Sequence, residues 1–419
     1  MRAPGCLFSK ARVIILVVVA IPALLLVGWL RTNAPQTPQV VFENNIASQP
    51  QPLPAQSFHI FNGKVASLGW IVGRDCQRGI QAYLKTAAAN PDAALVGTGW
   101  VDPTTGKLIN GEHNNCMPGS LSMDNVVQLI HSKGGMVYLT ITMETDGTAT
   151  AWTSQQQSDY IAKATTDAGY IDTIVNEVKR ANYDGVIMDL EGGDANYPQI
   201  QQLFATYNQR IWNALKPLNK YYGISLVHKV SDHDDYYNIN GFTNWTLLAH
   251  CADFIIIQAI DQSYYSPGPT VSLPYLKQLL DYALQTMPQM LPRVLWEFPL
   301  YGATWHYSGG QWIFDGGVLY QDAQTLVSQI PASEVNSSLS NLNDATSAHL
   351  VYTDASGVEH SMWYPTAKNL YYLISNFDKM LRQTAQFGNS QLQIAVWYRA
   401  TWEPGDVWQM IDPLIQINA

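Results

Sequence analysis

The chain has 419 residues, of which 47% are hydrophobic and only 13% are charged, so it can bury a large core and is not a disordered chain. Its net charge of −10 argues against binding to nucleic acid, which requires a basic surface. No Cys-x-x-Cys pair and no His-Glu-x-x-His motif occurs, so the sequence gives no sign of a zinc site.

The N-terminal region is expected to contact a membrane. Residues 13–30 form an apolar run close in length to the roughly 20 residues that cross a bilayer. Basic residues precede this run within 1–12 and only Arg31 follows it closely, which places 1–12 in the cytoplasm and the rest of the chain outside. We therefore expect a membrane-anchored extracellular domain. The alternative is a cleaved signal peptide and a secreted protein, although Pro35 makes the site before it a poor one for cleavage.

A spacer is expected after the membrane segment. Residues 31–57 are rich in Pro, Gln and Asn and show no periodicity, which is typical of a flexible linker. Beyond it, Cys76 and Cys116 could form a disulfide in an oxidising compartment, but their spacing alone does not decide the pairing.

From residue 58 onward, apolar runs alternate with amphipathic stretches, as in a parallel α/β fold. We expect strands at 65–72, 93–101, 135–143, 183–191, 222–227, 253–260, 293–299 and 391–397. We expect helices at 77–89, 123–132, 157–181, 197–215, 273–285, 367–386 and 406–411. Eight strands with helical links predict a (β/α)₈ TIM barrel over residues 58–419.

The connection between strand seven and helix seven is too long for a simple loop. Residues 301–365 are therefore expected to hold a small β-rich (α+β) insertion. Within it, the segments 350–352 (Leu-Val-Tyr) and 360–363 (His-Ser-Met-Trp) flank a turn at Ser356-Gly357.

The fourth predicted strand ends in two acids. Side chains alternate along a strand, so Gly185, Ile187, Asp189 and Glu191 share one face. Two carboxylates therefore emerge side by side at the C-terminal end of the strand, where α/β barrels place their active sites. Like charge raises the pKa of one carboxyl group, which is the state that a general acid needs. The structural alternative is a helix cap or an ion-pair site.

The stretch 183–191 resembles the strand-four motif of glycoside hydrolase family 18, Asp-x-x-Asp-x-Asp-x-Glu. Asp184, Asp189 and Glu191 match the motif, whereas Ile187 replaces its second Asp. Some peptidoglycan-acting members of the family also lack an acid there. The inserted unit and the helix and strand after it resemble the spore-germination and cortex-lytic branch of the family.

Three further segments carry the resemblance. Residues 254–261 are similar to the Met-x-Tyr-Asp motif of strand six: Asp261 matches, while Gln258 and Ile260 replace Met and Tyr. Tyr301 lies in a segment similar to Pro-Leu-Tyr-Gly after strand seven and is expected to line the cleft. Trp397 matches the strand-eight Trp that forms the floor under the sugar, with an ordinary core residue as the alternative.

The resemblance implies hydrolysis of a β-1,4 bond beside N-acetylglucosamine, in peptidoglycan or chitin-like glycans, without a metal or cofactor. Glu191 would act as the acid and base, and Asp189 would orient the acetamido group, whose oxygen attacks the anomeric carbon with retention. Asp184, Gln258, Asp261, Tyr301 and Trp397 would contact the substrate.

Two other functions remain open. One is a conventional retaining glycosidase in which Glu191 is the acid and base and Glu297 is the nucleophile. The other is a lectin-like barrel that binds glycans at the cell surface and has lost turnover. The apolar residues Ile187 and Ile260 favour the lectin, whereas Asp189 and Glu191 favour an enzyme.

Overall fold

The computed structural model describes residues 60–61, 65–71, 79–81, 83–84, 93–102, 106–109, 115–116, 121–142, 153–192, 195–232, 241–331, 333, 346–397 and 405–417. The predicted membrane segment at 13–30 and the spacer at 31–57 lie outside these residues, so both stay predictions. Cys76 and the side chain of Cys116 also lie outside them. Within the described ranges, no helix has both the length and the apolar character needed to span a bilayer.

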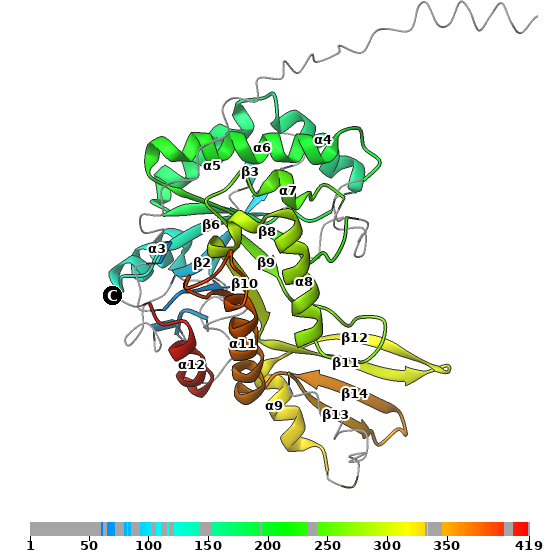
Figure 1. The fold of residues 1–419 in the computed structure, drawn as a ribbon. Helices are drawn as coiled ribbons and strands as arrows, with labels where there is room; N and C mark the ends of the chain where they lie inside the picture. The colour runs from blue at the N-terminus through cyan, green and yellow to red at the C-terminus, as the bar shows by residue number, and fades with distance from the viewer. Residues whose placement is uncertain are drawn as a thin grey trace, which may run out of the picture. The chain divides into compact units, whose positions relative to one another are not determined.

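One nine-stranded sheet holds eight parallel strands in the order β1-β15-β10-β9-β8-β7-β6-β2, and the short strand β3 (Leu108–Ile109) pairs antiparallel with β2. The strands are β1 (Ser67–Ile71), β2 (Ala93–Val101), β6 (Val137–Thr142), β7 (Gly185–Met188), β8 (Tyr221–Val227), β9 (Phe254–Gln258), β10 (Val294–Pro299) and β15 (Gln393–Trp397). Because β1 pairs with β15 on one side and with β2 on the other, the two ends of the sheet meet. The predicted α/β fold with a parallel, TIM-like sheet is confirmed (Figure 1).

Helices cover the outer face of this sheet (Figure 1). They are α3 (Met123–Ser132), α4 (Ser154–Ala164), α5 (Gly169–Ala181), α6 (Ile200–Leu215), α7 (Trp245–Leu248), α8 (Leu273–Thr286), α11 (Ala367–Arg382) and α12 (Gly405–Ile411). Short 3₁₀ turns follow at Lys216–Leu218, Pro288–Arg293 and Asp412–Leu414, and short strands occur at β3 (Leu108–Ile109), β4 (Asn115–Cys116) and β5 (Leu121–Ser122). The first predicted helix, at 77–89, is described only in part.

The single long helix predicted at 157–181 is wrong, because the chain forms two helices there. α4 begins at Ser154, three residues before the predicted start at Gln157, and the Thr153 side chain caps its first turn. It ends at Ala164, and the chain then turns through residues 165–168. The Asp167 carboxylate accepts a hydrogen bond from the Gly169 N–H at 2.8 Å, which stabilises this turn at the start of α5.

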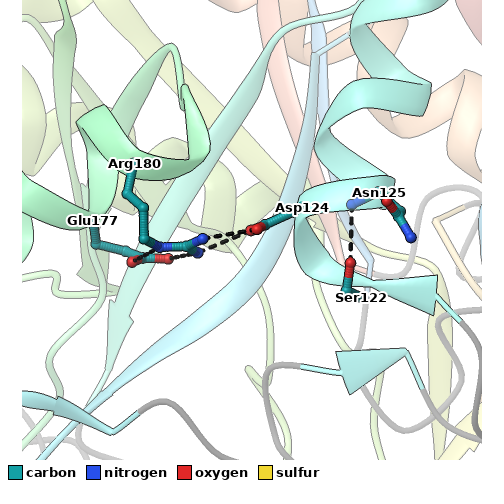
Figure 2. Close-up of polar contacts among 5 residues, drawn as sticks. All are labelled: Ser122, Asp124, Asn125, Glu177 and Arg180. Atoms are coloured by element: carbon teal, nitrogen blue, oxygen red, sulfur yellow. Dashed lines mark hydrogen bonds and ion pairs between the residues drawn. The ribbon is translucent and has the colours of Figure 1, made fainter.

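A surface ion pair joins α5 to α3. The Arg180 guanidinium donates to both oxygens of Asp124, at 2.7 and 2.8 Å, and also binds Glu177 one turn earlier on α5 (Figure 2). Asp124 lies in the first turn of α3, where the Ser122 side chain accepts a hydrogen bond from the Asn125 N–H. Because Arg180 and Asp124 are about half exposed, this bidentate pair orients the helices more than it stabilises the fold.

The interior of the sheet is filled by side chains from alternate strand positions. These residues form a cluster separate from the larger one between sheet and helices: Ala66, Leu68, Trp70, Tyr138, Ile187, Phe254, Ile256, Leu295 and Ala395. Gly223 provides space within this layer for the ring of Phe254, which packs edge-to-face on Tyr138 with ring centroids 5.7 Å apart. The apolar layer supports the polar residues that follow it along the same strands.

The predicted insertion is confirmed as a four-stranded antiparallel sheet in the order β12-β11-β14-β13. Its elements are β11 (Tyr301–Ser308), β12 (Gln311–Leu319), α9 (Tyr320–Gln329), β13 (Ala348–Thr353) and β14 (Glu359–Tyr364). β11 begins two residues after β10 ends, so the insertion continues directly from the parallel sheet. Trp305 ties it to the loop after β9, because its indole N–H donates to the Tyr264 carbonyl oxygen at 2.8 Å.

Gly223→Ala should destabilise the fold. A Cβ at this position would lie 2.4 Å from the Phe254 ring, which is fully buried and cannot move away freely. Overpacking of this kind lowers the free energy of unfolding by about 1–3 kcal/mol. Gly317→Ala on β12 is the control, because its Cβ would meet no atom closer than 3.7 Å. Urea unfolding of both variants checks the expectation, and equal stabilities would contradict it.

Candidate active site

The two acids after β7 lie on the inner face of the parallel sheet. Ile187 belongs to the interior cluster, and Asp189 follows it two residues later on the same face. The Asp189 N–H donates to the Ile141 carbonyl oxygen at 2.9 Å, which extends the pairing of β7 with β6 beyond the end of β7. Asp189 and Glu191 are both half-buried, so their carboxylates are partly shielded but remain accessible.

One amide group connects the two acids. The side-chain amide nitrogen of Gln258, at the end of β9, lies 3.2 Å from Asp189 Oδ1, 3.0 Å from Glu191 Oε1 and 3.0 Å from Ser225 Oγ. Gln258 is 8% exposed, so these bonds form away from bulk water. An amide placed between two carboxylates reduces their repulsion and holds them in a fixed relation.

The backbone of Glu191 is held from outside the sheet. The Gln157 side chain on α4 donates to the Glu191 carbonyl oxygen at 2.9 Å. Gly192 follows with φ +112°, and a Cβ there would lie 2.3 Å from the Gln157 amide. A glycine at this position therefore allows α4 to approach the acid-bearing loop closely.

A second carboxylate–donor pair lies at the ends of the neighbouring strands. The Tyr301 hydroxyl donates to Asp261 Oδ1 at 2.7 Å. Burial raises the pKa of Asp261, and the bond from Tyr301 opposes that shift. Asp261 has φ +53°, a left-handed conformation that redirects the chain after β9. The structure thus brings Asp261 and Tyr301 together, as expected for residues at the ends of adjacent strands.

Glu297 on β10 is buried inside the same region. Its side chain is 1% exposed, and its Cα pairs with Gln258 on β9 and with Ala395 on β15. Neither carboxyl oxygen has a hydrogen-bond partner among the described residues. Burial, followed by the charges of Asp189, Glu191 and Asp261, raises the pKa of Glu297 well above its usual value. Such burial does not favour Glu297 as a nucleophile, because a nucleophile must contact the sugar.

The structure places Asp184 apart from the two acids. It precedes β7 at the N-terminal end, where Asp184 Oδ2 accepts hydrogen bonds from the Val137 N–H at 2.7 Å and from His131 Nε2 at 2.8 Å. These bonds secure the start of the strand pair and the end of α3. Because Asp189 and Glu191 follow the opposite end of β7, Asp184 is left out of the candidate site.

The remaining predicted residue is only partly described. The backbone of Trp397 ends β15 in register with Pro299, but its side chain lies outside the described residues, so its place under the substrate stays a prediction.

Two residues of the site, Ser225 and Gln157, were not predicted from the sequence. Ser225 is a polar residue within the buried strand β8, which is a signal that could have indicated it. Gln157 gives no such signal, because it reaches the site from a helix distant in sequence.

A metal centre is not evident in the part of the chain that the structure describes. No three His, Cys, Asp or Glu side chains come together there in a way that could hold a metal ion. Two neutral donors, the Gln258 amide and the Tyr301 hydroxyl, are among the groups that bind the carboxylates of the candidate site.

Solved structures share this fold. A chitinase from Chromobacterium violaceum aligns with a TM-score of 0.65 and 17% identity, over 83% of this chain and 98% of that one. The spore cortex-lytic enzyme SleL from Bacillus megaterium aligns with a TM-score of 0.64 and 13% identity, over 84% and 75%. The GH18 chitinase ChiB from Flavobacterium johnsoniae aligns with a TM-score of 0.55 and 13% identity, over 84% of this chain and 94% of that one.

The comparison of structures finds this likeness, whereas the comparisons of sequence find no match. No protein-family model matches the chain, and no curated protein matches it. The structural similarity to family 18 chitinases and spore cortex-lytic enzymes that the motifs predicted is nevertheless present. At these low identities, the chain shares the fold of those glycosidases.

Asp184→Ala should reduce stability. The change leaves the Val137 N–H without its acceptor at the N-terminal end of β6, which lowers the free energy of unfolding by about 1–3 kcal/mol. Asp281→Ala, at an exposed ion pair with Lys277 on α8, is the control and should change it by less than about 1 kcal/mol. Urea unfolding gives both values. Loss of glycan binding by Asp184→Ala with unchanged stability would instead support a role in substrate binding.

Proposed function

We propose that the chain is a retaining glycosidase that cleaves β-1,4 bonds beside N-acetylglucosamine in peptidoglycan or chitin-like glycans. The observation that carries this proposal is the pair of carboxylates after β7, Asp189 and Glu191, which are both bound by the Gln258 amide from the end of β9. The shared fold supports it, because the similar structures include chitinases and cortex-lytic enzymes.

Glu191 is the general acid and base of the proposed reaction. In its protonated form it donates a proton to the glycosidic oxygen as the bond to the anomeric carbon breaks. The carbonyl oxygen of the substrate's acetamido group attacks that carbon and forms a cyclic oxazolinium ion. Glu191 then removes a proton from water, which opens the ring with net retention.

Asp189 has an electrostatic role in the same reaction. Its carboxylate orients the acetamido group and stabilises the positive charge that develops on it. For this purpose Asp189 must be ionised while Glu191 holds a proton. The Gln258 amide donates to both residues and keeps them close, and as a neutral donor it leaves the Asp189 charge in place. Asp261, Tyr301 and Trp397 are proposed to contact the sugar.

The proposed location follows from the sequence outside the described residues. An apolar segment at 13–30 preceded by basic residues anchors the protein in a membrane, with the catalytic domain on the extracellular side. A secreted form is the alternative, if the segment is a signal peptide. Either location gives access to cell-wall or chitin-like glycans.

A glycan-binding protein without turnover is the second candidate. Ile187 and Ile260 are both buried, at positions where the resembled motifs carry polar residues, so two polar groups that would contact the substrate or its neighbours are missing. The first test is incubation of the full chain with chitooligosaccharides and with peptidoglycan, followed by mass spectrometry of new reducing ends. Binding without product release would support the lectin.

Glu191→Gln should lower the rate of hydrolysis by about 10²–10⁴-fold, because it removes the proton donor while preserving the shape of the side chain. Product release measured by mass spectrometry checks this value. Glu359→Gln makes the same chemical change at a half-buried position on β14 and should leave the rate unchanged. Equal rates for the Glu191 variant and the wild type would contradict the assignment.

A substrate that carries a hydroxyl group in place of the acetamido group should not be cleaved. The proposed reaction needs the acetamido oxygen as its nucleophile, whereas a conventional retaining enzyme supplies its own carboxylate. The comparison uses two oligosaccharides that differ only in this group. Comparable release of product from both would replace the proposed mechanism with the conventional one.

A further inference from the structure

Three polar side chains point into the closed sheet from alternate strands: Thr140 on β6, Ser225 on β8 and Glu297 on β10. Thr140 and Glu297 each follow a member of the interior cluster by two residues, Tyr138 and Leu295 respectively, so they face the same interior. In α/β barrels, side chains from alternate strands build one interior layer. We call these three residues the polar layer.

The polar layer lies next to the group that binds the two acids. Ser225 Oγ is 3.0 Å from the amide nitrogen of Gln258, which contacts both carboxylates. Glu297 pairs in register with Gln258 on the adjacent strand. Thr140 pairs with Ile187, which is one inward position below the first acid on β7. A change in the polar layer can therefore reach the acids through one amide.

Two members of the polar layer have no hydrogen-bond partner in the part of the chain that the structure describes. Thr140 and Glu297 are each 1% exposed. Thr140 Oγ1 and both carboxyl oxygens of Glu297 bond to no other group, and so they do not bond to each other. Ser225 Oγ accepts a bond from Gln258, which leaves its own hydrogen to donate elsewhere. Buried polar groups are almost always hydrogen-bonded, so these groups indicate a small ligand between them.

The chemistry of the polar layer fits a neutral ligand that both donates and accepts. A hydroxyl group does both, and so does a protonated carboxyl group. The charged groups that act on Glu297 are Asp189, Glu191 and Asp261, all of them acids. Burial, followed by these charges, raises the pKa of Glu297 well above its usual value, so it keeps its proton and does not attract a cation. Water meets these demands, because a buried water makes about three hydrogen bonds.

We propose that the polar layer is a binding site for one ordered internal water molecule, hydrogen-bonded to Thr140, Ser225 and Glu297. The water fixes the direction of the Ser225 hydroxyl, which in turn holds the Gln258 amide. Thr140 and Glu297 are then positioning residues, since neither touches the sugar and each acts through the water. The effect on catalysis rests on the proposed function, whereas the water site does not.

A crystal structure of the full chain tests the water site directly. We expect one isolated density peak at hydrogen-bonding distance, about 2.5–3.0 Å, from Thr140 Oγ1, Ser225 Oγ and one carboxyl oxygen of Glu297. A direct bond from Glu297 to either hydroxyl, with no peak between them, would overturn the proposal. Crystals grown with rubidium as the monovalent cation add a control. An anomalous signal at the peak would identify a cation, which also contradicts the proposal.

Thr140→Val separates a bridged hydroxyl from an unpartnered one, because it replaces the hydroxyl by a methyl group of similar size. If water binds the hydroxyl, the lost bond raises the equilibrium constant of unfolding about 5-fold. Removal of an unpartnered hydroxyl would instead leave that constant unchanged or lower it, and this outcome counts against the proposal. Thr353→Val, at an exposed position on β13, is the control and should change the constant by no more than about 2-fold. Urea unfolding measures both variants.

The pH dependence of stability checks that Glu297 is neutral. The unfolded chain releases this proton near the usual glutamate pKa of 4.5, whereas the folded chain retains it above that value. The stability of the wild type should therefore fall relative to Glu297→Gln as the pH rises from about 4 to about 7. A difference between the two proteins that does not change with pH would mean that Glu297 is ionised in the fold, which contradicts a neutral polar layer.

Activity shows whether the water positions the acids. In Thr140→Val, kcat should fall about 2–10-fold with little change in KM, because one lost hydrogen bond loosens the Gln258 amide. Thr140→Ser keeps the hydroxyl and should recover most of the rate together with the density peak. Wild-type kcat in Thr140→Val, with the peak absent, would remove the positioning role. If the wild type cleaves no glycan, the density and the unfolding data still decide the water site, so the two failures are distinguishable.

Discussion

Two carboxylates that leave one strand on the same face repel each other, and a donor between them decides whether the arrangement is stable. In this protein the donor is the Gln258 amide, which approaches Asp189 and Glu191 from β9, two strands away in the sheet. The curvature of a closed sheet makes this contact possible, because side chains from non-adjacent strands converge inside it. The polar site therefore depends on closure of the parallel sheet.

Beneath the acids, the apolar layer fixes the height at which they meet. Phe254 and Tyr138 fill the interior where Gly223 leaves space, and the next inward positions along the strands are polar. Ser225, Gln258 and Glu297 occupy this second layer, and each is largely buried. Packing below and hydrogen bonding above are thus parts of one arrangement, in which a shift of one strand would displace both layers.

Much of this arrangement could be predicted from the sequence, because the alternation of side chains along a strand depends only on the order of its residues. Alternation along 185–191 placed Asp189 and Glu191 on one face, and the motif resemblance added Gln258, Asp261 and Tyr301. Asp184 belongs to the same motif but lies at the other end of β7, a distinction that requires the strand boundaries. The contact of Gln157 with Glu191 could not be predicted, because it depends on how α4 packs. The break between α4 and α5 was missed because the apolar face of the sequence continues across it.

The direct passage from β10 into β11 has a consequence for how the protein could diversify. Glu297 and Tyr301 are only four positions apart, and Tyr301 already holds Asp261, so the base of the insertion is coupled to the acids. The far ends of its hairpins, at Gly309-Gly310 and at Gly357, have no such coupling, since a Cβ added at any of these glycines contacts no other atom within 4 Å, and only the positive φ of each turn favours glycine there. Loops of new length and sequence can therefore be introduced at these tips without a change to Glu297, Tyr301 or Asp261.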